Sequence, residues 1–211
     1  HRIPIFCEKP FYSNIKGADP LLKLVSAQRL PTMVGCNMRF SSEVEEIPRD
    51  TRYISVYFGY NLKKWRPESD HLASYSSNKS QGGGVLLDAI HELDYLYYKF
   101  GSIKSIAYEV RRLTDITVDC EDMATGSIVF SNGTVADFSL NYLCDEYTRY
   151  YDVLIDNTIR RQFLTVDNQM YIDELNYFIN CLSRQVKTFL FNRPLRTLAP
   201  WAITGLMFTR F

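Results

Sequence analysis

Residues 86–94, LLDAIHELD, place a histidine between two aspartates in a stretch that is otherwise mostly apolar. If this stretch is a helix, Asp88 and Asp94 lie about one turn to either side of His91, where each carboxylate can reach the imidazole. A neighbouring carboxylate orients one ring nitrogen, leaves the other free and favours the protonated ring. We therefore expect His91, oriented by Asp88, to act as a general acid or base. Asp94 is expected to be structural, anchoring backbone or a basic side chain.

Two other stretches carry side chains suited to a ligand site. Lys9 follows an apolar run, and an ammonium at a strand end can hydrogen-bond a reacting oxygen and stabilise its charge. The long polar segment 63–84 contains Trp65, Arg66 and Tyr75. A tryptophan can stack on a sugar or nucleotide while an arginine binds phosphate or hydroxyls. From the residues alone, a surface lysine, a solvated loop and a merely structural His91 remain alternatives.

The pattern gives little support for a metal or a phosphate loop. Asp88, His91 and Asp94 lack a second histidine or a cysteine nearby and lack HExxH spacing, so we predict no metal site. The three glycines at 82–84 lack the GxxxxGK[ST] arrangement. They predict a tight turn before a helix, with a backbone that can approach a pocket closely.

Hydrophobic spacing indicates the elements that position these residues. A helix is expected from about residue 85 to residue 100, ending at Gly101. Its core-facing stripe follows helical spacing and consists of Leu86, Ile90, Leu93, Tyr97 and Phe100. Residues 3–8 and 32–40 are predicted strands around a helix at about 13–29, which together form a βαβ unit with parallel strands.

Residues 41–50 are polar, contain a proline and indicate a boundary. Beyond them we predict strands at 51–62, 102–114, 121–143 (a hairpin turning at Asn132-Gly133) and 150–166, and helices at 169–185 and 194–211. The expected fold class is α+β. Residues 41–211 would form an open, mostly antiparallel sheet with helices on one face, and residues 1–40 the last βαβ piece of a doubly wound domain.

Composition excludes several functional classes. The 211 residues contain 24 Lys and Arg against 24 Asp and Glu, which gives no electrostatic argument for nucleic acid or an anionic membrane as a partner. We find no apolar run long enough for a membrane span. The five cysteines are widely spaced and form no CxxC pair, which is typical of reduced thiols in a cytoplasmic protein.

Several motifs together resemble the glucose–fructose oxidoreductase / inositol dehydrogenase (Gfo/Idh/MocA) family over nearly the whole chain. In order, they are CEKPF (7–11), VGCNMRF (34–40), GGGVLLDAIHELDYLYYKFG (82–101), FSNGTVADFSLNY (130–142) and MYIDELNYFINCL (170–182). The resemblance implies a Rossmann domain that binds NAD or NADP. It also implies an α/β domain that shapes the sugar pocket and forms a homodimer or homotetramer through its open sheet face.

The resemblance also implies roles for individual residues. Lys9 would reach the reacting carbon, His91 would be the acid or base, and Asp88 would match an acid that family members often place three or four residues earlier. Four residues would lie near the cofactor, namely Glu8, Pro10 (with a cis bond before it), Asn37 and Arg39. The implied reaction is hydride transfer between the nicotinamide and a secondary alcohol of a sugar, cyclitol or sugar nucleotide.

The chain departs from the family in lacking any GxGxxG phosphate loop. We therefore expect a truncated chain, with residues 1–40 as the end of the Rossmann domain and no tight binding of NAD by this chain alone. The alternative function is a non-catalytic dimerisation module or a sugar-binding module derived from the family.

Overall fold

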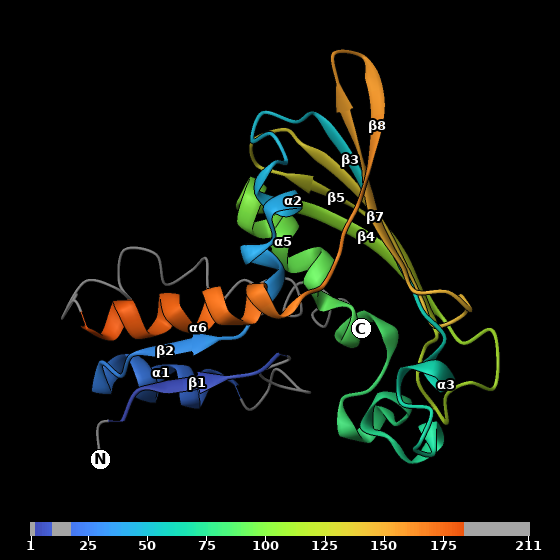
Figure 1. Cartoon of the computed structure of the whole chain (residues 1–211), viewed down its shortest axis with the longest axis horizontal. Helices are drawn as coiled ribbons and strands as arrows, with labels where there is room; N and C mark the ends of the chain where they lie inside the picture. Colours follow the sequence, from blue (N-terminus) through green and yellow to red (C-terminus); the bar gives the residue numbers. More distant parts are fainter. Residues whose placement is uncertain (1–2, 10–17, 184–211) are drawn as a thin grey trace.

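The computed structural model describes residues 3–9 and 18–183, which form a small parallel sheet, a larger mixed sheet and the helices packed against them (Figure 1). Strand β1 (Ile5–Cys7) pairs in parallel with β2 (Thr32–Val34), and helix α1 (Ala18–Gln28) connects them. The predicted parallel βαβ unit is therefore confirmed. The start of the predicted helix and the predicted helix at 194–211 lie outside the described residues.

The predicted strand at 32–40 is wrong beyond residue 34. The chain turns instead into the 3-10 helix η2 (Asn37–Phe40) and the short helix α2 (Ser42–Glu45). The hydroxyl of Ser41 accepts a hydrogen bond from the Val44 backbone N–H and so caps α2. This break places Asn37 just past the end of β2.

The larger sheet has the strand order β4-β5-β6-β3-β7-β8. Its strands are β3 (Tyr53–Gly59), β4 (Ile103–Arg111), β5 (Met123–Phe130), β6 (Val135–Asn141), β7 (Thr148–Ile155) and β8 (Thr158–Phe163). Only the β3–β6 pair is parallel, so the expected mostly antiparallel sheet is confirmed. The predicted hairpin turns at Asn132-Gly133, where Gly133 adopts a positive φ of 94°.

Helices cover one face of this sheet, and the hydrophobic core lies between the two layers (Figure 1). The predicted helix at 85–100 is present as two pieces, α4 (Val85–Asp88) and α5 (Ile90–Phe100), which meet at Ala89. Among its described residues, the sheet's other face carries polar and aromatic side chains such as Tyr57 and Tyr150, which stack with ring centroids 5.0 Å apart.

The long polar segment 63–84 folds into a series of single helical turns. They are α3 (Leu62–Trp65), η3 (His71–Ala73), η4 (Tyr75–Ser77) and η5 (Lys79–Gln81). The side chains of Asn61 and Asp70 accept hydrogen bonds from the backbone at the start of α3 and η3. These caps fix the segment in place although it has little apolar core of its own.

Helix α6 (Asn168–Ser183) returns from the large sheet and lies along β1 and β2 (Figure 1). Phe178 on α6 packs on Phe6 of β1, with ring centroids 5.5 Å apart. The buried carboxylate of Glu174 accepts a hydrogen bond from the Cys36 N–H, and burial raises the pKa of Glu174 to about 7. These contacts hold the small sheet against η2 and fix Lys9 and Asn37 relative to the larger domain.

No helix within residues 3–9 and 18–183 is both long enough and apolar enough to cross a bilayer.

Candidate functional site

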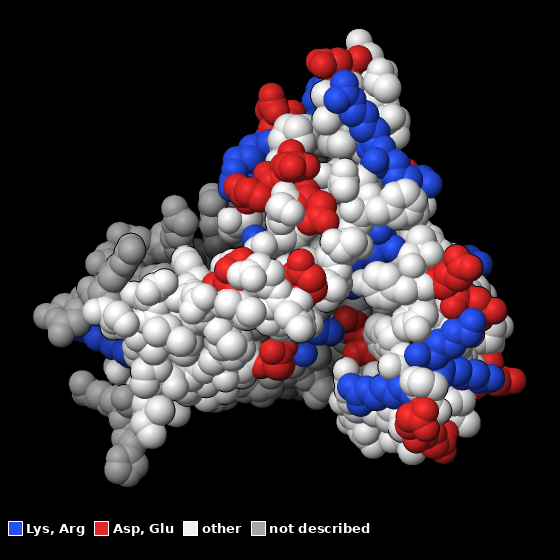
Figure 2. All heavy atoms as spheres, in the orientation of Figure 1, with Lys and Arg blue, Asp and Glu red and all other residues white. Residues whose placement is uncertain are grey.

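A pocket of about 840 Å³ lies where the small sheet, the α4–α5 junction and the 62–81 connection meet. In the view of Figure 2 a hollow separates the sparsely charged face over α6 from the 62–81 connection, which carries charges of both signs. Seven of the residues predicted from sequence line this pocket, namely Lys9, Asn37, Trp65, Arg66, Tyr75, Asp88 and His91. The volume is within the range of small-molecule sites.

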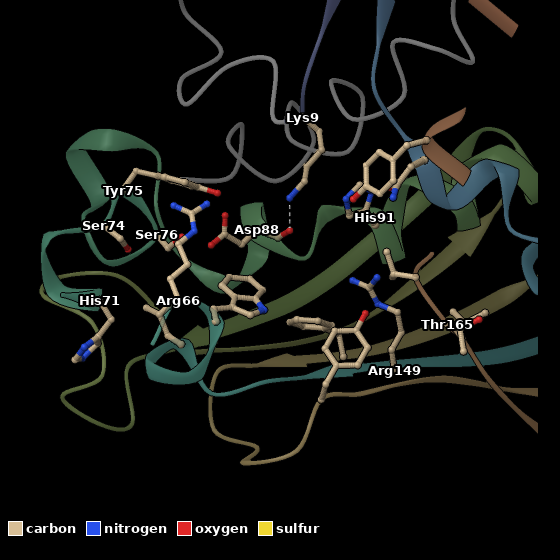
Figure 3. Close-up of a pocket in the computed structure, with 18 of the residues that line it drawn as sticks. Lys9, Arg66, His71, Ser74, Tyr75, Ser76, Asp88, His91, Arg149 and Thr165 are labelled. Atoms are coloured by element: carbon tan, nitrogen blue, oxygen red, sulfur yellow. Dashed lines mark hydrogen bonds between the residues drawn. The ribbon is translucent and has the colours of Figure 1, made fainter. Parts of the chain in front are cut away.

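Lys9 reaches the α4–α5 junction from the end of β1. Its Nζ donates a hydrogen bond of 2.6 Å to the backbone carbonyl of Asp88 (Figure 3). Burial lowers the pKa of Lys9, and the charge of Asp88 partly opposes this shift. An ammonium held in this way keeps donors for a second oxygen inside the pocket.

His91 does not have the environment expected from its sequence. Burial lowers the pKa of His91 well below its ordinary value, and the charges of Lys9 and Arg149 lower it further. The expectation that flanking carboxylates favour the protonated ring is therefore wrong. His91 Nδ1 is buried and has no hydrogen-bond partner among the described residues. The ring is neutral near pH 7 and can accept a proton.

The carboxylate of Asp88 is engaged elsewhere. Its Oδ2 accepts a hydrogen bond of 2.6 Å from the hydroxyl of Tyr142, which is fully buried. Burial and the Asp88 charge raise the pKa of Tyr142 well above its ordinary value, so this phenol stays a donor. The helix breaks at Ala89, between Asp88 and His91. The Oδ1 of Asp88 is left without a hydrogen-bond partner among the described residues.

Asp94 pairs with Arg39 through two hydrogen bonds, of 2.7 Å from Nε and 2.5 Å from Nη2. The expected structural role of Asp94, anchoring a basic side chain, is confirmed. Arg39 also lies over the ring of Tyr98 and does not line the pocket. Glu8 is exposed beside Gly35 and does not line it either. Pro10 lies outside the described residues.

Arg149, on β7, was not predicted from sequence. It is 7% exposed, lines the pocket and forms an ion pair of 2.7 Å with Glu92, which is fully buried. Its guanidinium lies 4.8 Å from the ring centre of Phe58. Burial raises the pKa of Glu92, and Arg149 opposes that shift. In the sequence, the only signal for the Arg149–Glu92 pair was that Glu92 directly follows His91.

Aromatic rings form one wall of the pocket. Trp65 packs edge-on against Tyr142, with ring centroids 5.5 Å apart, and at a tilt against Phe58 at 6.0 Å. Tyr147 meets Phe58 edge-on at 6.0 Å. Trp65 is therefore held by other rings, and the part of it facing the pocket is a rigid apolar surface.

The glycines at 82–84 allow the backbone of Tyr75 and Ser76, on another wall of the pocket, to come close to the start of α4. A Cβ atom on Gly83 would collide with the backbone carbonyls of Tyr75 and Ser76, and one on Gly84 would collide with the carboxylate of Glu121. Gly84 also has a φ of 112°. The predicted tight turn and close backbone approach are confirmed, since both Tyr75 and Ser76 line the pocket.

Buried polar atoms without a partner are concentrated here. Buried polar groups are normally hydrogen-bonded, so orphaned atoms that line a cavity indicate where a ligand supplies the missing bonds. Among the described residues, those that line the pocket are Asn37 Oδ1, His71 Nε2, Ser74 Oγ, Asp88 Oδ1 and His91 Nδ1.

Solved structures with the same fold include several dehydrogenases. The UDP-N-acetylglucosamine 3-dehydrogenase GnnA from Acidithiobacillus ferrooxidans is 18% identical, with a TM-score of 0.65 over 96% of this chain and 69% of that chain. Scyllo-inositol dehydrogenase from Lactobacillus casei, solved with NAD(H) and scyllo-inositol, is 16% identical, with a TM-score of 0.68 over 96% and 70%. A putative myo-inositol dehydrogenase from Sinorhizobium meliloti is 17% identical, with a TM-score of 0.71 over 98% and 72%.

At these identities the likeness shows the fold alone. No curated protein matches the chain in a sequence search. The family model described as the GFO/IDH/MocA C-terminal domain matches residues 52–159, which is half of the 211-residue chain. The chain therefore belongs to the GFO/IDH/MocA family of oxidoreductases.

Proposed function

We propose that this chain forms the substrate site of an NAD(P)-dependent dehydrogenase that acts on a secondary alcohol of a sugar, cyclitol or sugar nucleotide. The observation that carries the proposal is the meeting of Lys9, Asp88 and His91 in one pocket, from elements far apart in the sequence. The family is one of oxidoreductases, and similar structures are of sugar and cyclitol dehydrogenases.

The residues at the ends of β1 and β2 suit a nicotinamide cofactor. Ligands of open α/β sheets bind outside the carboxyl ends of the parallel strands, where Lys9 and Asn37 lie. Asn37 offers a buried, unpartnered amide oxygen to a carboxamide. When bound, the nicotinamide supplies the hydride acceptor or donor. We propose that residues 1–40 belong to the cofactor-binding domain and residues 41–211 to the substrate domain.

The protein's own groups would manage the proton and the oxygen. Neutral His91 would accept the proton of the substrate hydroxyl as its carbon loses hydride, and would return it in the reverse reaction. The Lys9 ammonium would stabilise the charge on that oxygen. Asp88 Oδ1 would accept a hydrogen bond from a neighbouring hydroxyl and orient the ring. The aromatic wall at Trp65 would exclude water from the reacting side.

The experiment is an absorbance assay for reduced nicotinamide, run on the natural protein that contains this chain. NAD and NADP would each be offered with scyllo-inositol, myo-inositol and UDP-N-acetylglucosamine. Reduction of either cofactor with at least one of these alcohols is expected. Binding of these compounds with an affinity unaffected by cofactor, and with no reduction, would instead indicate a sugar-binding module.

A further inference from the structure

The pocket has two ends that differ chemically. Figure 3 shows His91, Arg149 and Thr165 on one side, Arg66, Tyr75 and their neighbours on the other, and Lys9 and Asp88 between them. The proposed reaction uses the first end and the middle. The second end is built from the single-turn helices of residues 62–77, and the proposed reaction uses only Trp65 from it, as the wall that excludes water.

The charges of the pocket balance at the first end and not at the second. Arg149 is paired with Glu92, and Lys9 lies against the carbonyl of Asp88 and is attracted by its carboxylate. Asp88 is the only carboxylate among the described lining residues. Arg66, the third lining cation, forms no ion pair within the described part of the chain.

The nearest acidic residues in sequence do not neutralise Arg66. Glu68 and Asp70 are exposed, and neither lines the pocket. The Oδ1 of Asp70 instead accepts a hydrogen bond from the Leu72 N–H at the start of η3. The charge of Arg66 is therefore free to act on a ligand.

Other donors surround this guanidinium. Arg66 lies over the ring of Tyr75, 5.9 Å from its centre, and the stacking limits its movement. Burial and the nearby Asp88 carboxylate raise the pKa of Tyr75, so its phenol stays protonated. The buried Ser74 Oγ lines the same side of the pocket and has no described hydrogen-bond partner. An arginine fork with hydroxyls beside it matches the oxygens of an anionic group.

We propose that this end is an anion subsite in which Arg66, with Ser74 and Tyr75, holds a phosphoryl or carboxylate group of the substrate away from the reacting carbon. The subsite rests on the proposed function, since it assumes a sugar-like ring at Lys9 and His91. It narrows the substrate class to sugars that carry a negative charge and disfavours neutral cyclitols.

Two matched ligand pairs test the subsite by isothermal titration calorimetry on the full chain. N-acetylglucosamine and its 1-phosphate differ by a phosphoryl group, and glucose and glucuronate differ by a carboxylate. The variants are Arg66→Gln and, as the control, Lys63→Gln, which removes an exposed cation of α3, the short helix that ends just before Arg66, outside the pocket. Thermal unfolding of each variant checks that it is folded.

Tighter binding of at least one anionic member is expected, with a loss of roughly tenfold or more in Arg66→Gln and no loss in Lys63→Gln. The pair that responds identifies the group as phosphoryl or carboxylate. Equal affinity within both pairs, or no binding by any probe, overturns the proposal. An equal loss of affinity for neutral and anionic sugars in Arg66→Gln also overturns the proposal. Arg66 would then act on the pocket through Asp88 and would not bind the anionic group. If the absorbance assay shows hydride transfer but calorimetry shows no preference for anionic ligands, only the subsite is refuted. If calorimetry shows that preference but the assay shows no hydride transfer, only the proposed function is refuted.

Discussion

Lys9 donates a 2.6 Å hydrogen bond to the backbone carbonyl of Asp88, a residue 79 positions later in the chain. This contact joins the end of the small parallel sheet to the helix break that precedes His91. It fixes an ammonium beside the imidazole, and the two positive neighbours, Lys9 and Arg149, help to keep that imidazole neutral.

Replacing Lys9 by Met should lower kcat/KM by roughly 10²–10³-fold, because a charged donor to the developing oxyanion is lost. The control is Lys99→Met. Lys99 is also a buried lysine that donates to a carbonyl, that of Glu45 at 2.8 Å, but it does not line the pocket. A similar loss of kcat/KM in both variants would mean that Lys9 only supports the fold.

Replacing Asp88 by Asn should raise KM more than it lowers kcat. The unpartnered Oδ1 is free for a substrate hydroxyl, whereas Oδ2 is engaged by Tyr142 and neither is bonded to His91. Steady-state kinetics separate the two constants, and Asp94→Asn, which breaks the Arg39 pair outside the pocket, is the control. A fall in kcat with unchanged KM would support the original expectation that Asp88 orients His91.

The pH profile of kcat/KM should show that the positive charge of Arg149 lowers the pKa of His91. Because the pKa of His91 is lowered, the acidic limb should lie below His91's ordinary value of about 6.5, with activity lost as pH falls through the folded pKa. Arg149→Met removes a positive neighbour, raises the pKa of His91 and should move this limb to higher pH. Arg161→Met, which removes an arginine bound to Asp152 outside the pocket, should not move it. An unmoved limb in Arg149→Met would contradict this electrostatic account.

The Glu92–Arg149 pair should respond asymmetrically to truncation. Glu92→Leu leaves a buried guanidinium that cannot lose its proton, which costs about 3–5 kcal/mol of unfolding free energy. Arg149→Leu should cost less, because burial already raises the pKa of Glu92 and the carboxyl can be neutral. Urea unfolding of both single variants and the double variant measures this order. The reverse order would show that Glu92 stays charged without its partner.

Local patterns predicted much of the fold and seven of the residues that line the pocket. The βαβ unit, the Asn132-Gly133 hairpin and the apolar stripe of α5 depend on short-range spacing, which is visible in one sequence. Lys9, His91 and Arg66 came from motifs or from side chains suited to a ligand. In each case the residue type already indicated the chemistry.

The environment of each group could not be predicted in this way. The helix breaks at Ala89, between Asp88 and His91. Tyr142, which follows β6, donates a hydrogen bond to the Asp88 carboxylate. Arg149 enters the pocket from β7, which only the sheet order places near α5. The charge on His91 depends on these long-range neighbours, so its pKa was assigned the wrong direction.

The most direct test of the account is the activity of His91→Asn in the natural protein, with the alcohol and cofactor that the absorbance assay identifies. We predict a fall in kcat of roughly 10²–10⁴-fold, the usual contribution of a general acid or base, with cofactor affinity unchanged. Turnover equal to that of the wild type would contradict a catalytic role for His91 and favour a structural role for the helix that carries it.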